Sequence, residues 1–104
     1  MLLRIWRTGV DPARWAEYAR FEQEHSLPMF RQQSGCRGVL FGRLAGGSGA
    51  AACSFWDDQA AIEQLATSQT YKATVARLLA TGLLAGSQSV EVFEIAGGAV
   101  ELIL

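Results

Sequence analysis

A cluster of turn residues, AGGSG at positions 45–49, separates two short segments whose composition is typical of β-strands. Residues 36–44 (CRGVLFGRL) precede the cluster, and residues 50–56 (AAACSFW) follow it. A glycine-rich turn between two such segments favours a β-hairpin. Gly38 and Gly42 in the first strand indicate a bulge or the close approach of another backbone. The sequence therefore predicts an antiparallel pair of strands at its centre.

A strand and a helix are predicted before this hairpin. Residues 2–8 (LLRIWRT) form a short segment rich in residues that favour strands. Asp11 followed by Pro12 is typical of a helix N-cap and first helical position. Apolar residues then recur at helical spacing as far as His25. We expect Pro28 to end or kink this helix, because proline lacks an amide hydrogen.

A further helical region and a last strand are predicted after the hairpin. Asp57 or Asp58 is placed to cap a helix, and near Ser68 the chain starts another helix that ends at Gly82. Residues 89–95 (SVEVFEI) alternate between polar and apolar side chains, as a half-buried strand does. The apolar positions at helical spacing are Ala61, Ile62 and Leu65 in the first helix, and Tyr71, Val75, Leu78 and Leu79 in the second.

The order of elements, β-α-β-β-α-β, predicts an α+β fold of the ferredoxin-like type. In that fold four strands form an antiparallel sheet, and both helices cover one of its faces. The first strand then lies beside the last. A register that sets Arg4 opposite Glu94 and Arg7 opposite Glu91 would form two cross-strand ion pairs. Positions 4 and 7 differ in parity, so one pair would face the helices and the other the opposite side.

The face of the sheet without helices is expected to bind a second copy of the chain. Ile5 with Trp6, and Val92 with Phe93, place bulky apolar groups on both faces of the sheet. An antiparallel sheet with one face in water would instead alternate polar and apolar side chains. A second sheet packed on this face is the simplest way to cover it, which predicts a homodimer through the sheet faces.

One domain is predicted for residues 1–96, with a tail at 97–104. A chain of 104 residues is too short for a second hydrophobic core. The tail begins with Gly97 and Gly98 and continues as AVELIL, a segment of high β-propensity with a single charge. We expect it to dock on a sheet edge or on the partner subunit, because a free segment of this kind promotes aggregation.

Charge and cysteine content exclude several classes of partner. The net charge is −1 and the nine basic residues are scattered, so no nucleic-acid or membrane partner is predicted. Arg4 and Arg7 interrupt the apolar N-terminus, which argues against a signal peptide. In the hairpin Cys53 would lie opposite Leu40 and away from Cys36, so a disulfide is not expected. With one histidine and no CxxC spacing, no metal site is predicted, and we expect a cytoplasmic protein with free thiols.

Five pieces of the sequence carry a resemblance to a known family. They are RIWRT, LPMFRQQSGCRGVLFGR, SFWDDQAAI, SQTY and VEVFEI, which together span residues 4–95. In this order they resemble the antibiotic biosynthesis monooxygenase domain family, of the dimeric α/β barrel superfamily. The resemblance implies a homodimer with a pocket between sheet and helices in each protomer. In that family the pocket oxidises aromatic polyketides or quinols with oxygen and without a cofactor, while a related branch degrades haem.

The sequence also departs from the family pattern. It contains no asparagine, whereas an asparagine near the tryptophan of the FW motif is typical of both branches. No histidine follows Trp56, which argues against haem degradation. Three functions stay open. One is a cofactor-independent monooxygenase that acts on a small aromatic or quinone-like molecule, and the second is a non-catalytic dimeric module that binds such a molecule. The third is a structural dimer with a filled cavity, against which the small residues Ala50, Ala51 and Ala52 argue.

His25 is the candidate catalytic residue. Tyr18, Phe21 and His25 share one side of the first helix, which would direct the imidazole into the space between helix and sheet. There it could act as a general base on a phenol. The alternative is a partly solvated histidine near a helix C-terminus, where the helix dipole favours it.

Four aromatic residues are the candidates for substrate binding. The resemblance implies that Trp56 lines the pocket, and the alternative is that its indole closes one end of the core. Tyr71 and Tyr18 would bury their rings, and each hydroxyl then needs a ligand or a protein group as its hydrogen-bond partner. Phe41 is the fourth candidate, with core packing as its alternative.

Overall fold

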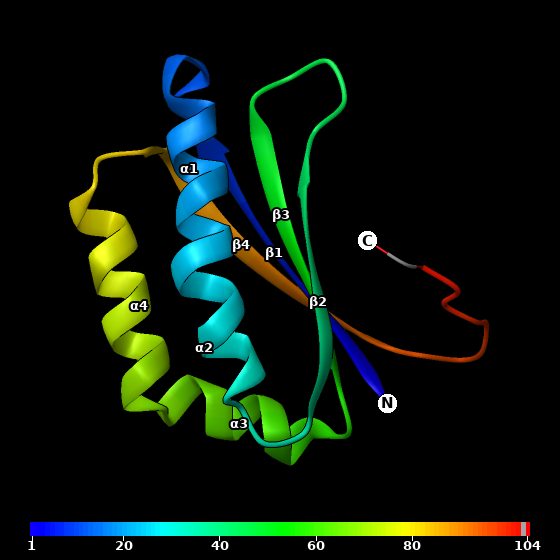
Figure 1. Ribbon diagram of the computed structural model, residues 1–104. Helices are drawn as coiled ribbons and strands as arrows, with labels where there is room; N and C mark the ends of the chain where they lie inside the picture. Colours follow the sequence, from blue (N-terminus) through cyan, green and yellow to red (C-terminus); the bar gives the residue numbers. More distant parts are fainter. Residues whose placement is uncertain (103) are drawn as a thin grey trace.

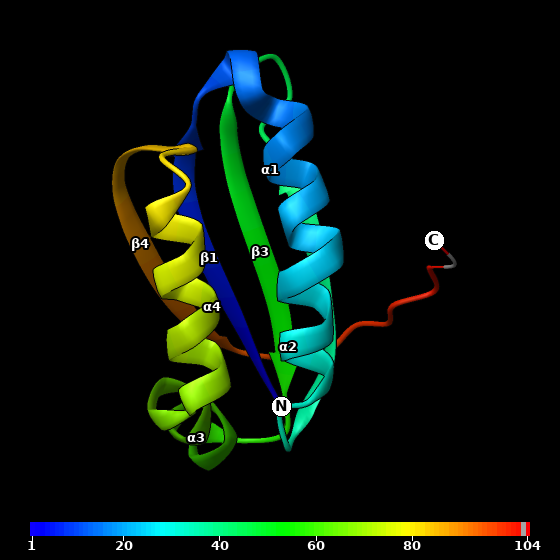
Figure 2. The same cartoon turned by 60° about the vertical axis from the view of Figure 1, so that its left-hand side comes forward.

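The computed structural model describes residues 1–102 and 104, which fold into one antiparallel sheet and a set of helices (Figures 1 and 2). Ile103 lies outside the described residues, so the predicted tail at 97–104 is described except for that position. No helix of the described chain has the length and apolar character that crossing a membrane requires. In chain order the elements are β1 (Leu2–Val10), the 3-10 turn η1 (Pro12–Arg14), α1 (Trp15–Phe21), the π-helical turn η2 (Glu22–Ser26), α2 (Leu27–Arg31), β2 (Cys36–Arg43), β3 (Gly49–Trp56), α3 (Gln59–Thr67), α4 (Gln69–Ala80) and β4 (Leu84–Glu94).

The four strands form one antiparallel sheet in the order β2-β3-β1-β4. Helices α1, α2 and α4 lie side by side on one face of this sheet, and α3 crosses its end (Figure 2). The predicted α+β, ferredoxin-like fold is therefore confirmed. The space between this layer of helices and the sheet is the interior in which a site can lie.

Short polar side chains start the helices where the sequence predicts them. The Asp11 carboxylate accepts a hydrogen bond from the Ala13 amide, and Pro12 occupies the first position of the turn. Asp58, rather than Asp57, caps α3 by accepting from the Ala61 amide at 2.9 Å. Ser68 caps α4 in the same way, which divides the second helical region into two helices.

Pro28 does not end the first helical region. The chain passes from α1 through the π-helical turn at Glu22–Ser26 directly into α2, which contains Pro28 in its first turn. Proline has no amide hydrogen and its ring crowds the carbonyl one turn earlier. The wider π turn, which precedes it, relieves that crowding without breaking the helix. Glu22, at the start of this turn, and Ser26, at its end, are both buried against the interior.

The hairpin has the predicted register, with Leu40 opposite Cys53. The predicted pairing of β1 with β4 is wrong by two residues, since Arg4 lies opposite Val92 and Leu2 opposite Glu94. The strand β4 is also longer than expected and begins at Leu84, and its register with β1 shifts at a bulge between Arg7 and Gly9. A Cβ at Gly9 would collide with the carbonyl oxygen of Ala85, which accounts for glycine at this position.

The two arginines of β1 consequently have different surroundings from those predicted. Arg7 on the outer face still pairs with Glu91, across a diagonal of the two strands. Arg4 points toward the helices and does not reach Glu94. Cross-strand charge alone could not distinguish the two registers, because a diagonal neighbour is within reach of an arginine side chain.

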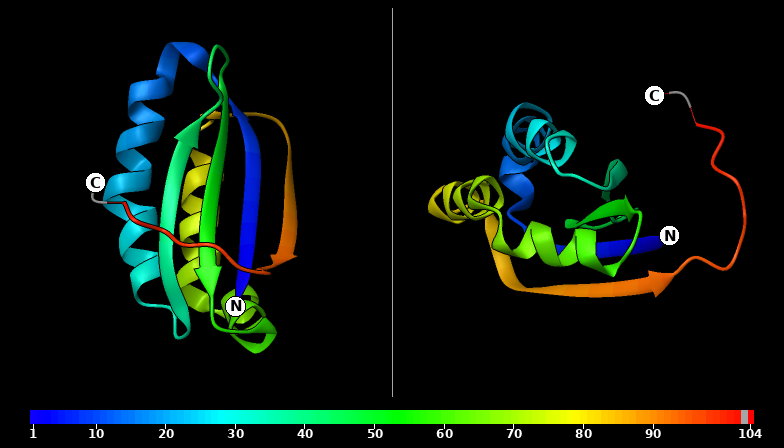
Figure 3. Two further views of the ribbon diagram at one scale, coloured as in Figure 1. Left: turned by 90° about the vertical axis from the view of Figure 1, so that its right-hand side faces the viewer. Right: turned by 90° about the horizontal axis from the view of Figure 1, so that it is seen from below.

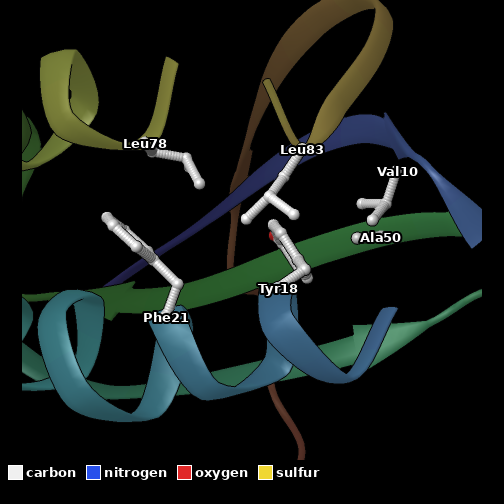
Figure 4. Packing of buried hydrophobic residues seen from close by; sticks show 6 residues of the cluster. All are labelled: Val10, Tyr18, Phe21, Ala50, Leu78 and Leu83. Carbon is white, nitrogen blue, oxygen red and sulfur yellow. The ribbon is translucent and has the colours of Figure 1, made fainter. Parts of the chain in front are cut away.

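Two apolar clusters fill the interior. The first joins α1 and α4 to the sheet, and Figure 4 shows its members around Tyr18 and Leu83. The second packs α2 and α3 around Trp56. Leu79, predicted on the inner stripe of α4, is 55% exposed, because Leu78 occupies the inward position and the next residue is turned by about 100°. The first cluster consists of Val10, Tyr18, Phe21, Ala50, Leu78 and Leu83, and the second of Met29, Phe30, Trp56, Ala61, Ile62 and Leu65.

The opposite face of the sheet carries no helix (Figure 3, left). After β4 the tail passes across this face and extends away from the sheet (Figure 3). Val100, Leu102 and Leu104 are exposed in the single chain. Docking of the tail on a sheet edge or on the partner subunit stays a prediction, and so does the pairing of two sheets.

Candidate functional site

A small cavity of about 40 Å³ lies between the sheet and the helices. Its polar groups come from three elements: Arg4 on β1, Glu22 and Ser26 on η2, and Tyr71 and Thr74 on α4. The remaining wall is apolar and consists of Trp6, Met29, Phe30, Ala52, Val75 and Leu78. An apolar cavity with a few convergent polar groups is the usual form of a small-molecule site.

Arg4 is the most unusual residue of this cavity. Its side chain is buried, with 6% of the residue exposed, and Nη2 donates a hydrogen bond to the Tyr71 hydroxyl at 3.2 Å. The ion pairs among residues 1–102 and 104 do not include Arg4. A guanidinium has five N–H donors, and a buried cation without a counterion costs several kcal/mol. The Glu22 carboxylate lines the same cavity, but no ion pair among the described residues joins it to Arg4, so the guanidinium can bind the acidic group of a ligand.

Glu22 faces the same cavity from the π turn. It is 4% exposed, and its carboxylate accepts a hydrogen bond from the Ser26 hydroxyl at 2.6 Å. Burial raises the pKa of Glu22 above its ordinary value, while the hydrogen bond from Ser26 acts in the opposite direction. A carboxylate with a raised pKa is a stronger base than one on the surface, so Glu22 can accept a proton from a ligand in the cavity.

Tyr18 lies one helical turn before Glu22. Its hydroxyl is buried and has no hydrogen-bond partner of regular geometry among the described residues. Burial, followed by the charge of the nearby Glu22, raises the pKa of Tyr18 above its ordinary value. Tyr18 therefore stays protonated at neutral pH, and its ring is a member of the first apolar cluster (Figure 4).

His25 does not line the cavity, so its predicted direction is wrong. The imidazole lies on the outer side between η2 and α4, with Nδ1 3.5 Å from Nη1 of Arg77 and the ring against Phe21. The prediction assumed regular α-helical spacing from Tyr18 to His25. The π turn changes that spacing, turning Ser26 inward and leaving His25 outside.

Trp56 lies in the core. No part of it is exposed, its Nε1 donates to the Ser54 hydroxyl at 2.8 Å, and its ring meets Phe30 edge-on. It does not line the cavity, so the structure supports the alternative in which the indole closes one end of the core. Strand β3 delivers it there because Ser54 and Trp56 are two residues apart and share the helix-facing side.

Replacing Ser54 with alanine should lower the free energy of unfolding by about 1–3 kcal/mol, because the buried Trp56 N–H then loses its acceptor. Urea unfolding followed by tryptophan fluorescence measures this difference. Ser89→Ala, on the exposed part of β4, is the control and should change the free energy by less than about 0.5 kcal/mol. Equal effects for both variants would contradict the proposed role of the hydrogen bond.

The other predicted binding residues divide between two sites. Tyr71 lines the Arg4 cavity, where its hydroxyl accepts a hydrogen bond from Arg4. Tyr18 and Phe41 instead border a groove of about 520 Å³ between α1 and β2, which Leu104 also borders. The structure thus does not bring the five predicted residues together, and the chemistry-bearing groups of the cavity include three that were not predicted: Arg4, Glu22 and Ser26.

No family model matches the sequence. No curated protein matches it either.

Solved structures match over nearly the whole chain. A candidate antibiotic biosynthesis monooxygenase from Caulobacter crescentus is 15% identical with a TM-score of 0.78, and the match covers 92% of this chain and 90% of that one. A protein of unknown function from Nitrosomonas europaea is 22% identical with a TM-score of 0.77, covering 97% and 94%. A NIPSNAP domain protein from Burkholderia xenovorans is 17% identical with a TM-score of 0.68, covering 97% and 100%.

These similarities confirm the predicted resemblance at the level of the fold. The chain has the fold of structures named as antibiotic biosynthesis monooxygenases, and the same fold occurs in proteins named otherwise. Because a shared fold hosts different activities, the site itself must carry the argument for function.

Proposed function

We propose that this chain binds a small aromatic or quinone-like molecule with an acidic oxygen in the Arg4 cavity and oxidises it with molecular oxygen without a cofactor. The observation that supports this most is the buried Arg4 guanidinium, which has a tyrosine hydroxyl but no carboxylate as partner among the described residues. A phenolate or enolate oxygen would supply the negative charge. The fold shared with structures named as monooxygenases, together with the family resemblance of the sequence, suggests the reaction class.

The cavity residues suggest how such a reaction would proceed. The Glu22 carboxylate takes a proton from the substrate, and Arg4 with Tyr71 holds the resulting oxyanion. The electron-rich anion then reacts with oxygen. For an anthrone-like methylene, the carbon gains a hydroperoxide group and loses water, so that one CH₂ and one O₂ give one C=O and one H₂O. The proton held by Glu22 returns to the peroxide in this sequence, and no external reductant is consumed.

The size of the cavity sets a condition on this proposal. A volume of about 40 Å³ holds roughly three water molecules, which is less than an aromatic ring requires. The described form is therefore closed, and a ligand must displace side chains from the apolar part of the wall. Met29 is well suited to such a change, because its unbranched side chain has three rotatable bonds.

Oxygen consumption by the purified protein tests the proposal, with hydroquinones and anthrones as candidate substrates. We expect protein-dependent uptake that persists in His25→Ala, because His25 lies outside the cavity. An oxygen electrode measures the uptake, and for the anthrones product analysis should show one O₂ consumed for each methylene converted to a carbonyl. Uptake that disappears in His25→Ala would instead assign the base to His25 and contradict the role given to Glu22.

A non-catalytic binding module is the second candidate. The core position of Trp56 favours it, because the tryptophan that lines the pocket in the resembling family does not reach the cavity here. A binding module would show saturable quenching of tryptophan fluorescence by the same compounds, with no oxygen uptake. Trp6 lines the cavity and would report such binding directly.

A further inference from the structure

An outer hollow lies next to the closed cavity. It has a volume of about 590 Å³ and lies between the α1–η2–α2 segment and α4. Two residues, Met29 and Thr74, line both the hollow and the cavity, one from each side of the seam between α2 and α4. These two side chains are therefore all that the two spaces share, and they form a common wall.

The mouth of the hollow carries basic groups. Arg77 on α4 and His25 on η2 approach each other to 3.5 Å, and the ion pairs among the described residues do not include Arg77. Glu24 also borders the hollow and supplies the opposing negative charge. The remaining polar groups of the rim are neutral amides and hydroxyls from Gln32, Gln69 and Thr70. An anion that approaches this mouth meets the permanent positive charge of Arg77, partly offset by Glu24, before it reaches Arg4.

We propose that the hollow between α2 and α4 is the entrance to the Arg4 cavity for acidic aromatic ligands. Met29 and Thr74 form its gate, and Arg77 selects for anions at its mouth. This inference rests on the proposed function, because it assumes that the cavity is the ligand site. It adds the route of access and the charge of the ligand that uses this route.

The seam between α2 and α4 can open without the loss of any backbone hydrogen bond among the described residues. Among the described residues no backbone hydrogen bond joins the two helices, so separating them breaks only side-chain contacts. The hydrogen bond from Gln33 to Ser68, at 3.2 Å, holds the far ends of the two segments together and can act as a pivot. The groove between α1 and β2 is the competing route, and it shares only the buried Glu22 with the cavity.

Two matched variants of α4 test the entrance. Ala73 lines the hollow but not the cavity, whereas Ala76 is exposed on the same helix and lines neither. In Ala73→Phe we expect the association and dissociation rates of hydroxynaphthoate to fall together by about tenfold, with an unchanged Kd, because a plug slows passage in both directions. Ala76→Phe should leave both rates as they are. Stopped-flow quenching of tryptophan fluorescence gives the two rates.

A second pair of probes tests the selection by charge. Arg77→Gln should slow the association of hydroxynaphthoate about fivefold at low salt and leave its uncharged methyl ester unaffected. Arg20→Gln, exposed on α1 and outside the hollow, is the control.

The results separate this inference from the proposed function. Binding with rates that Ala73→Phe leaves unchanged would overturn the entrance but leave the cavity as the site. A change in the dissociation rate alone would also overturn it, since position 73 would then contact the bound ligand. Absence of binding to the native chain would overturn the proposed function and the entrance together.

Discussion

An Arg4→Met variant is expected to bind an acidic aromatic ligand about 100-fold more weakly than the native chain while it remains folded. The ligand would lose two charge-assisted hydrogen bonds, each worth at least about 1.5 kcal/mol, and 1.4 kcal/mol corresponds to a factor of ten. Methionine has a similar length and keeps the apolar contacts of the arginine stem. Titration of hydroxynaphthoate by tryptophan fluorescence, with Trp6 at the cavity wall, measures the change.

Stability should move in the opposite direction. A buried charge without an ion-pair partner costs free energy, so replacing it by an apolar group of similar volume should be neutral or stabilising. Thermal unfolding should therefore show an equal or higher Tm for Arg4→Met. Such a result would show that the native chain retains Arg4 at a cost in stability, as is expected of a residue kept for binding.

Arg7→Met provides a matched control on the same strand. Arg7 faces the outer side of the sheet, is exposed and pairs with Glu91, so its loss should change stability by at most about 1 kcal/mol and leave affinity unchanged. Equal loss of affinity in both variants would indicate a general effect of positive charge on β1 and would contradict a specific site at Arg4.

Glu22→Gln is expected to reduce turnover by about 10²–10⁴-fold, which is the usual contribution of a general base. Glutamine keeps the shape of the side chain and an oxygen that can accept from Ser26, but it cannot take a proton. Binding of the uncharged methyl ester should change little. Oxygen uptake at saturating substrate measures turnover, and Glu63→Gln on the exposed face of α3 is the control.

The same substitution should make the protein more stable at neutral pH. Burial raises the pKa of Glu22 in the folded chain above its value in the unfolded chain. Between these two values the folded state binds more protons, so the free energy of unfolding falls as the pH rises through this window. Above it the loss is complete, at about 1.4 kcal/mol for each pH unit that separates the two pKa values.

Urea unfolding at two pH values distinguishes this effect from a change in packing. Glu22→Gln should be more stable than the native chain at about pH 7, and the difference should shrink at about pH 3, where the carboxyl is protonated in both states. A difference that is the same at both pH values would show that the effect does not come from ionisation. Turnover of the native chain should decline as the pH falls and Glu22 becomes protonated.

Local signals in the sequence were sufficient for the fold. Asp11 with Pro12, and Ser68, begin helices for reasons that lie within a few residues of each site. The hairpin register followed from one turn, and Leu40 lies opposite Cys53 as predicted. The pairing of β1 with β4 was wrong by two residues, because Arg7 reaches Glu91 from a diagonal position as well as from the directly opposite one.

The site was harder to predict, because it depends on one irregular turn. The alternation of β1 already indicated that either Arg4 or Arg7 would face the helices, which is the signal for a buried arginine. Regular helical spacing from Tyr18 places both Glu22 and His25 inside, whereas the π turn places Ser26 there instead of His25. A π turn has no strong local signature, although Pro28 just beyond it is consistent with one.

The π turn at Glu22–Ser26 also makes the number of residues in this part of the chain important for the site. Such a turn contains one residue more than an α-helix needs to connect the same two flanks. An in-frame loss of a single codon within it would let α1 and α2 join as one regular helix, with both apolar clusters still supplied by their own residues. Only the side chains of the turn would change direction. A single codon therefore separates two chains that share a fold but line the cavity differently.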